Sequence, residues 1–113
     1  MECLFCKIAK GAIKTDFVYE DKDIVAFNDI KPQAAVHVVV IPRVHIERIQ
    51  DIDDGQLELM GRFLSVIPKI ATLRKIDKSG YRVIINCNKD AGQEIFHLHA
   101  HLLGGRKFSW PPG

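Results

Sequence analysis

The chain has 113 residues and a mass of 12.8 kDa, so we treat residues 1–113 as a single domain. Hydrophobic residues make up 47% and charged residues 27%, a balance typical of globular proteins rather than disordered ones. With 16 basic and 14 acidic residues the formal net charge is +2, so neither nucleic acid nor an anionic membrane is an expected partner. The apolar runs are too short to cross a bilayer, and three cysteines do not make a disulfide scaffold. We expect a reduced, cytoplasmic domain that buries more apolar surface as a homodimer.

The first half of the chain contains three short runs with strand character. Residues 17–20 and 24–27 flank a polar break, which predicts a hairpin. Residues 36–41 are almost all β-branched and are followed by Pro42, which predicts a well-buried strand that ends there. Residues 44–49 predict a short helical turn.

The second half predicts one long helix and two further strands. Asp53 is a suitable N-cap, and apolar residues recur at helical spacing as far as Leu73. Because proline has no amide hydrogen, Pro68 predicts a kink or a local break in this helix. Residues 81–87 and 97–103 predict the remaining strands, separated by a loop. The order β-β-β-α-β-β favours an α+β fold with an antiparallel sheet over a doubly wound parallel one.

Three of the five histidines occupy alternate positions in one short segment, His-Leu-His-Ala-His at residues 97–101. On a strand, alternate side chains point to one face, so the imidazoles would line one face while the apolar residues between them enter the core. His37 lies in the other strong strand and can join the same face if the two strands are neighbours. A lone histidine is usually structural, but several converging imidazoles indicate metal binding or catalysis.

Three functional interpretations compete for this cluster. A metal centre of the His-x-His type usually adds an acidic residue soon after the second histidine, and none occurs in the six residues after His99. A zinc finger would join Cys3 and Cys6 to two of the clustered histidines, but nearly the whole chain separates the two pairs. The third interpretation is nucleophilic catalysis on phosphorus by a histidine.

The segment His-Leu-His-Ala-His-Leu-Leu resembles the signature His-φ-His-φ-His-φ-φ of the histidine triad (HIT) family, where φ is apolar. The chain is most similar to the branch of histidine triad nucleotide-binding proteins, the nucleoside phosphoramidases. The resemblance implies a HIT-like fold: an antiparallel sheet of about five strands, one long helix, a short N-terminal helix, and sheets joined across a dimer. Further matches follow in register along nearly the whole chain, at residues 5–8, 26–30, 32–34, 37–42, 80–82, 86, 92–93, 104–106 and 110–113.

The resemblance implies a catalytic role for three histidines. His99, the middle histidine of the triad, would attack the α-phosphorus of a nucleotide and form a nucleotidyl-histidine that water then hydrolyses. His101 would donate hydrogen bonds to the phosphate as charge develops. His37 would help to fix the orientation or protonation of the neighbouring imidazole.

A second set of residues matches positions that bind the nucleotide. Asp29 matches an acid that accepts hydrogen bonds from the ribose hydroxyls. Since a carboxylate next to a phosphate is repulsive, we expect Glu94 to offer its backbone N–H or to turn its side chain away. For the apolar members, ordinary core packing is the alternative to flanking the base. Besides Asp29, His99 and His101, the expected contacts with sugar and phosphate are Asn86, Gly92, Gln93 and Glu94, and those with the base are Leu4, Phe5, Ile8, Phe27, Ile30 and Val39.

The pair Cys3 and Cys6 has three interpretations: a redox pair, half of a metal site, or two uninvolved cysteines. A redox motif follows a strand, and only two residues precede Cys3, which argues against the first. The resemblance implies that His45 and His97 complete a Cys₂His₂ site for structural zinc. No cofactor is needed for the chemistry itself.

Two classes of function stay open. The first is a hydrolase acting on nucleoside 5′-phosphoramidates or related nucleotidyl conjugates, with purine nucleotides such as AMP or GMP derivatives as its expected partners; a dinucleoside polyphosphate hydrolase is a variant of it. The second is a nucleotide-binding regulatory module whose hydrolysis is incidental. The intact triad favours an enzyme, since a pure binder needs no nucleophile. The Trp-Pro-Pro-Gly ending at 110–113 favours the phosphoramidases. The resemblance also implies that the tail from Phe108 to Gly113 reaches towards the site of the partner subunit.

Overall fold

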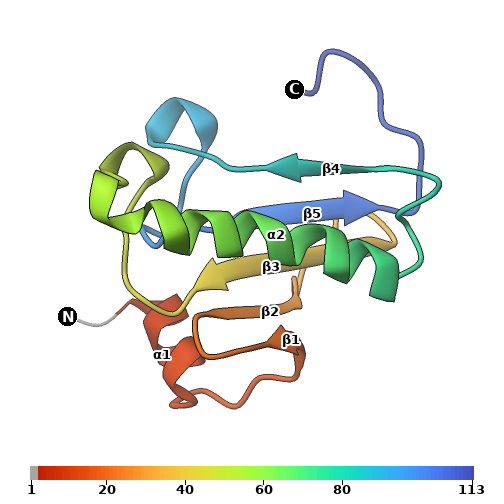
Figure 1. The fold of residues 1–113 in the computed structure, drawn as a ribbon. Helices are drawn as coiled ribbons and strands as arrows, with labels where there is room; N and C mark the ends of the chain where they lie inside the picture. The colour runs from red at the N-terminus through yellow and green to blue at the C-terminus, as the bar shows by residue number, and fades with distance from the viewer. Residues whose placement is uncertain (1–2) are drawn as a thin grey trace.

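The computed structural model describes residues 3–113. Within that range, no helix is both long enough and apolar enough to cross a membrane. Figure 1 shows a single sheet crossed by one long helix, with a short helix near the N-terminus. The helices and strands are α1 (Leu4–Lys10), β1 (Phe17–Glu20), β2 (Ile24–Asn28), β3 (Val36–Pro42), α2 (Leu57–Leu73), β4 (Tyr81–Ile84) and β5 (Ala100–Gly104), with 3₁₀ turns at Ile49–Asp51, Asp54–Gln56 and Lys89–Ala91.

The five strands form one antiparallel sheet in the order β1-β2-β3-β5-β4. The central strand β3 pairs with both β2 and β5, and its register with β5 places Val39 opposite His101 and His37 opposite Leu103. The predicted α+β class, with a five-stranded antiparallel sheet, one long helix and a short N-terminal helix, is confirmed.

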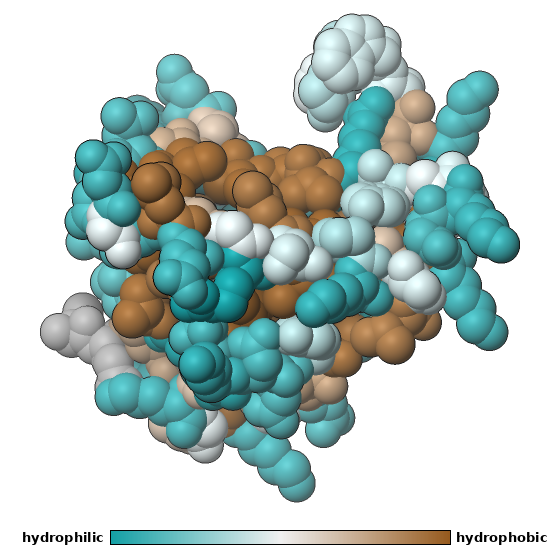
Figure 2. All heavy atoms as spheres, viewed as in Figure 1, coloured by the Kyte–Doolittle hydropathy of each residue, from teal (hydrophilic) through white to brown (hydrophobic). Residues whose placement is uncertain are grey.

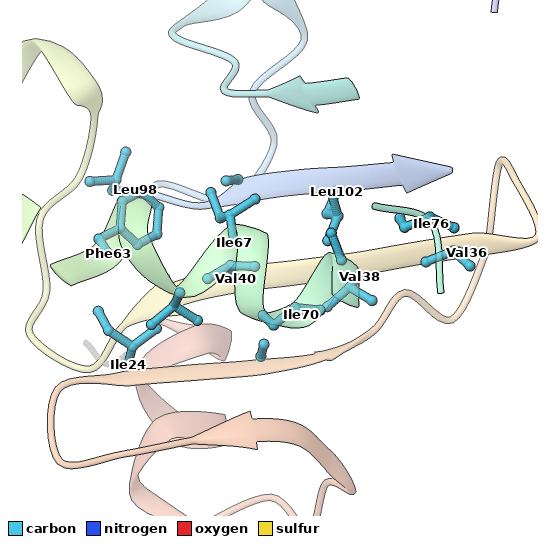
Figure 3. Packing of buried hydrophobic residues seen from close by; sticks show 14 of the residues in the cluster. Ile24, Val36, Val38, Val40, Phe63, Ile67, Ile70, Ile76, Leu98 and Leu102 are labelled. Carbon is cyan, nitrogen blue, oxygen red and sulfur yellow. The ribbon is translucent and has the colours of Figure 1, made fainter. Parts of the chain in front are cut away.

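The alternation of side chains along β2, β3 and β5 divides the interior into two cores, one on each face of the sheet. One face packs against α2, and Figure 3 shows its members interleaved. The other face packs against α1 through Phe5 and Ile8. Since Leu98, Ala100 and Leu102 belong to the α2 core, the histidines between them lie on the face of α1. The labelled members of the α2 core are Ile24, Val36, Val38, Val40, Phe63, Ile67, Ile70, Ile76, Leu98 and Leu102.

The long helix begins after a 3₁₀ turn that Asp53 caps. The Asp53 side chain accepts a hydrogen bond from the Gly55 N–H, and the Gln56 side chain accepts one from the Asp53 N–H, which forms a capping box. The predicted break at Pro68 is absent, because α2 runs without interruption from Leu57 to Leu73. Pro68 lies on the exposed side of α2, where water can satisfy the carbonyl that its missing N–H leaves unpaired.

Three predicted boundaries are wrong for a shared reason. The Leu98 N–H donates to the Ile46 carbonyl over 2.6 Å, so the chain bends there, and β5 starts at residue 100 instead of 97. Without a partner strand beyond His101, β4 ends at Ile84 instead of residue 87. The segment 44–49 is not the predicted helical turn, since its carbonyls bond to the loop before β5, and the 3₁₀ turn starts only at Ile49.

Candidate active site

Three histidines gather on the face of the sheet that α1 covers. His37 projects from β3, His101 from β5, and His99 lies immediately before β5. The ring centroids of His37 and His101 lie 5.1 Å apart, and those of His99 and His101 lie 5.0 Å apart. The predicted neighbourhood of the two histidine-bearing strands is therefore correct, and its cause is the β3–β5 pairing.

The hydrogen bonds of His37 fix which of its nitrogens carries the proton. The Gln33 backbone N–H donates to His37 Nδ1 over 3.0 Å, so Nδ1 is an acceptor and the proton of the neutral ring lies on Nε2. That nitrogen lies 2.9 Å from His101 Nδ1 and 3.4 Å from Asp29 Oδ2. His101 Nδ1 thus accepts from His37, which leaves the His101 Nε2–H as a donor.

His99 is held in the opposite tautomer. Its Nδ1 lies 2.7 Å from the His97 carbonyl oxygen, and because a carbonyl can only accept, Nδ1 carries the proton. The lone pair of Nε2 is then available as a nucleophile. The ring of Phe5 packs edge-on against His99, with centroids 5.1 Å apart, and restrains its orientation.

Burial keeps the supporting imidazoles neutral. Desolvation, together with His99 and His37, lowers the pKa of His101 to about 4. Desolvation also lowers the pKa of His37, and the opposing attraction of Asp29 does not offset it. The hydrogen bonds require the same state, because an imidazolium at His101 would place two N–H groups against each other.

Two adjoining cavities form a continuous cleft beside these histidines. The larger one, of about 590 Å³, is mostly apolar, and the smaller one, of about 310 Å³, contains all three histidines. An apolar chamber next to a polar one suits a ligand with a flat base at one end and a phosphate at the other. Six residues line both cavities: Phe5, Asp29, Lys31, Val39, Glu94 and Ile95.

The cleft brings together nearly all the residues that the sequence predicted for nucleotide binding. Gln93 lines neither cavity: its buried side chain bonds to the Glu47 and Ile95 carbonyls and to the Asn88 N–H, which braces the loop before the triad. The larger cavity is lined by Leu4, Phe5, Ile8, Phe27, Asp29, Ile30, Val39 and Glu94, and the smaller one by Phe5, Asp29, His37, Val39, Asn86, Gly92, Glu94, His99 and His101.

Seven residues that line the cleft were not predicted from the sequence: Ile13, Lys14, Thr15, Asn28, Lys31, Gln33 and Ile95. Lys31 and Ile95 line both cavities, and Gln33 acts through its backbone N–H on His37. Lys31 lies between two segments that match the family in register, residues 26–30 and 32–34, so its positive charge next to a predicted phosphate site could have indicated a role. A backbone donor has no signature in a sequence.

A second cluster joins α1 to the triad. Cys3, Cys6, His45 and His97 bring four ligand atoms within 4.8 Å of one another. The S–N distances are 3.2–3.5 Å, and the two Nδ1 atoms lie 3.3 Å apart. In a zinc tetrahedron with Zn–N of about 2.0 Å and Zn–S of about 2.3 Å, the N–N and N–S edges are about 3.3 and about 3.5 Å. The donor set and its spacing therefore fit a metal ion such as zinc.

The surroundings of His97 set the tautomer and the neutral state that a metal ligand needs. Its Nε2 donates to the Pro42 carbonyl over 2.7 Å, which leaves the lone pair of Nδ1 directed at the cysteines. Complete burial lowers the pKa of His97, so the ring is the neutral ligand that a metal requires. His97 also supplies the carbonyl that holds His99, so one residue belongs to both clusters.

Comparison with known proteins gives the same family as the triad. The model of the HIT domain matches residues 10–108. A purine nucleoside phosphoramidase of Escherichia coli (strain K12) is 43% identical over 105 residues, which cover 93% of this chain and 88% of that protein. An uncharacterized HIT-like protein of Buchnera aphidicola (subsp. Baizongia pistaciae) is 47% identical over 106 residues, which cover 94% and 95% of the two chains.

The solved structures agree with this result. A HIT family hydrolase from Legionella pneumophila Philadelphia 1 superposes with a TM-score of 0.96 at 48% identity, covering 99% of this chain and all of that one. A histidine triad protein from Clostridium difficile gives a TM-score of 0.92 at 45% identity, over 96% of this chain and 95% of that one. The chain belongs to the HIT family, as the triad predicted, and is a hydrolase of that family similar to purine nucleoside phosphoramidases.

Proposed function

We propose that the protein hydrolyses nucleoside 5′-phosphoramidates or related nucleotidyl conjugates at the α-phosphorus, through a covalent intermediate on His99. The observation that carries this proposal is the 2.7 Å bond from His99 Nδ1 to the His97 carbonyl, which places the proton of the neutral ring on Nδ1 and the lone pair on Nε2, in a residue that lines the cleft. A purine derivative of the AMP or GMP type is the expected substrate, in keeping with the name of the Escherichia coli relative.

The reaction proceeds in two displacements at phosphorus. In the first, His99 Nε2 forms a bond to phosphorus, the bond to the leaving amine breaks, and the amine departs with a proton from solvent. In the second, water attacks phosphorus, the bond to His99 breaks, and the water proton returns to solvent. The His101 Nε2–H stabilises the charge that develops on the phosphoryl oxygens, and His37 keeps that proton on Nε2.

The remaining site residues position the nucleotide. The apolar walls of the larger cavity, including Ile8, Phe27 and the exposed Ile30, flank the base. Asp29, between the two cavities, accepts from the ribose hydroxyls through Oδ2, because Oδ1 already accepts from the Lys31 N–H. Asn86 and the loop at 92–94 surround the phosphate end.

A substrate panel tests the proposal. Adenosine and guanosine phosphoramidates should be hydrolysed with a higher kcat/KM than diadenosine polyphosphates. The preference follows from the phosphate end of the cleft, whose lining offers a single cationic side chain, Lys31, and two carboxylates, Asp29 and Glu94, to a polyphosphate. A reversed order would instead indicate a dinucleoside polyphosphate hydrolase, and tight nucleotide binding without turnover would indicate a regulatory module.

We also propose that the protein is a two-fold symmetric homodimer, in which α2 and the edge strand β4 form the interface. Apolar side chains gather above α2 in Figure 2, in the region that leads to β4 in Figure 1. Leu64 on α2 and Val83 on β4 are 53% and 42% exposed. A cavity of about 110 Å³, whose lining includes Leu64, Met60 and Ile85, is lined by apolar residues alone. A second copy would cover this surface and extend the sheet at β4.

Sedimentation at micromolar concentration should therefore give the mass of a dimer. A charge at the interface, in Val83→Glu, should shift the mass to that of a monomer, because an unpaired carboxylate would be buried. Val44→Glu, on an exposed loop residue outside the proposed interface, is the matched control and should sediment as the wild type does. If the wild-type protein sediments with the mass of a monomer under these conditions, the proposed dimer is wrong.

The C-terminal tail would reach the partner's site in this dimer. Arg82 on β4 holds the tail, with its guanidinium 5.3 Å from the centre of the Phe108 ring and 6.0 Å from that of Trp110. Trp110 is 82% exposed, so its indole is available to a second subunit. A stiff Pro111-Pro112 pair loses little entropy when it docks.

A further inference from the structure

The charged side chain of Glu94 has no role in the two displacements described above. Glu94 lines both cavities, at the junction where base, sugar and phosphate meet. Within the part of the chain that the structure describes, no salt bridge joins its carboxylate to a cation. The neighbouring backbone is fixed, because the buried Gln93 makes three side-chain hydrogen bonds. Glu94 therefore lines the cleft from a fixed stretch of backbone.

We infer that Glu94 determines which leaving groups the enzyme accepts: its charge favours amines and disfavours phosphates. The inference rests on the proposed hydrolysis at the α-phosphorus. A departing amine gains a proton and becomes an ammonium ion in neutral solution, whereas a departing nucleotide or pyrophosphate carries away additional negative charge. A leaving group in the 310 Å³ cavity lies within a Debye length of the Glu94 carboxylate, about 8 Å at physiological ionic strength. The carboxylate thus lowers the barrier for the first kind of leaving group relative to the second.

Lys31 provides the opposite charge at the same place. It lines the same two cavities, and its ammonium group likewise has no salt-bridge partner among the described residues. With Asp29 and Glu94, the junction of the cavities holds two carboxylates and one ammonium. Removing Glu94 or Lys31 should therefore change the selectivity in opposite directions.

The experiment compares kcat/KM for adenosine 5′-phosphoramidate carrying a neutral alkylamine with kcat/KM for diadenosine tetraphosphate. Glu94→Gln should reduce the amide-to-polyphosphate ratio about five- to tenfold, and Lys31→Gln should raise it, as expected for one unit charge at close range. The change in this ratio caused by Glu94→Gln should become smaller as salt is added, because the carboxylate acts on the leaving group through a long-range electrostatic interaction that salt screens. Glu58→Gln, on the exposed face of α2 next to Arg62, is the matched control and should keep the wild-type ratio.

A second measurement does not depend on turnover. In the His99→Ala background, Glu94→Gln should tighten binding of ADP relative to AMP by a similar factor. If the wild type hydrolyses no conjugate, the proposed function fails, yet the ADP-to-AMP ratio still tests Glu94. An unchanged ratio in both measurements, or equal shifts with Glu94→Gln and Glu58→Gln, would overturn the role of Glu94 and leave the chemistry at His99 intact.

Discussion

His99→Ala is expected to abolish turnover of nucleotidyl conjugates while leaving nucleotide binding measurable. Among the imidazoles that line the described cleft, His99 is the one whose neutral tautomer carries the lone pair on Nε2, and loss of a covalent nucleophile costs on the order of 10⁴-fold or more in kcat. Binding should survive, because the apolar walls of the larger cavity and Asp29 do not depend on His99. Steady-state kinetics and equilibrium binding of AMP measure the two effects separately.

His101→Ala provides the graded comparison. It removes a hydrogen-bond donor rather than the nucleophile, so kcat should fall by about 10²–10³-fold without reaching zero. Quenching the wild-type reaction during turnover should trap one nucleotidyl group on the protein, and the adduct should be absent from His99→Ala. If His99→Ala kept a kcat close to the wild-type value, the covalent mechanism would be wrong.

The fold could be predicted where local pattern and tertiary packing agree. The β-rich runs at residues 24–27 and 36–41 predicted both strands, and these strands are buried because each of their faces packs against a different helix. Prediction failed where a backbone group bonds to a distant segment. The hydrogen bond from the Leu98 N–H to the Ile46 carbonyl makes β5 shorter than predicted. Because β4 pairs only with β5, it is shorter as well. The helix predicted from the apolar spacing continues through Pro68, because on the exposed face water can satisfy the carbonyl that proline leaves without a hydrogen-bond donor.

The members of the site were predictable, but their protonation was not. The alternate positions of the three triad histidines predicted that they share one face, although only His101 lies within β5, and strand pairing adds His37. The tautomers depend on two backbone groups, the Gln33 N–H and the His97 carbonyl, and on burial that lowers the pKa of His101 to about 4. The separation of His97 from the other two triad histidines likewise required the structure, because Cys3 and Cys6 at the start of α1 lie 3.3 and 3.5 Å from His97 Nδ1 and draw it into the cluster with His45.

Removal of metal is expected to lower the melting temperature by about 10 °C or more. We propose that one zinc ion per chain binds Cys3, Cys6, His45 and His97, and that it is structural, because four protein ligands close the site. The ligands come from α1, from the loop after β3 and from the triad, so the ion links segments that are distant in sequence. Loss of at least ~2 kcal/mol of stabilisation shifts the melting temperature of a small domain by this amount.

The expected loss is concentrated in the smaller of the two cores. Cys3 caps α1, and Phe5 and Ile8 of that helix form the core on the histidine face, whereas the core beneath α2 contains no residue of α1. Chelation should therefore expose the α1 amides to hydrogen exchange before those of α2, and reduce activity only as far as α1 loosens. Cys6→Ser should reproduce the effect, whereas Cys87→Ser, outside the cluster, should not. Purified protein with a zinc content near zero and a melting temperature unchanged by added zinc would leave Cys3 and Cys6 without a metal role, because a bound structural ion must stabilise the state that it binds.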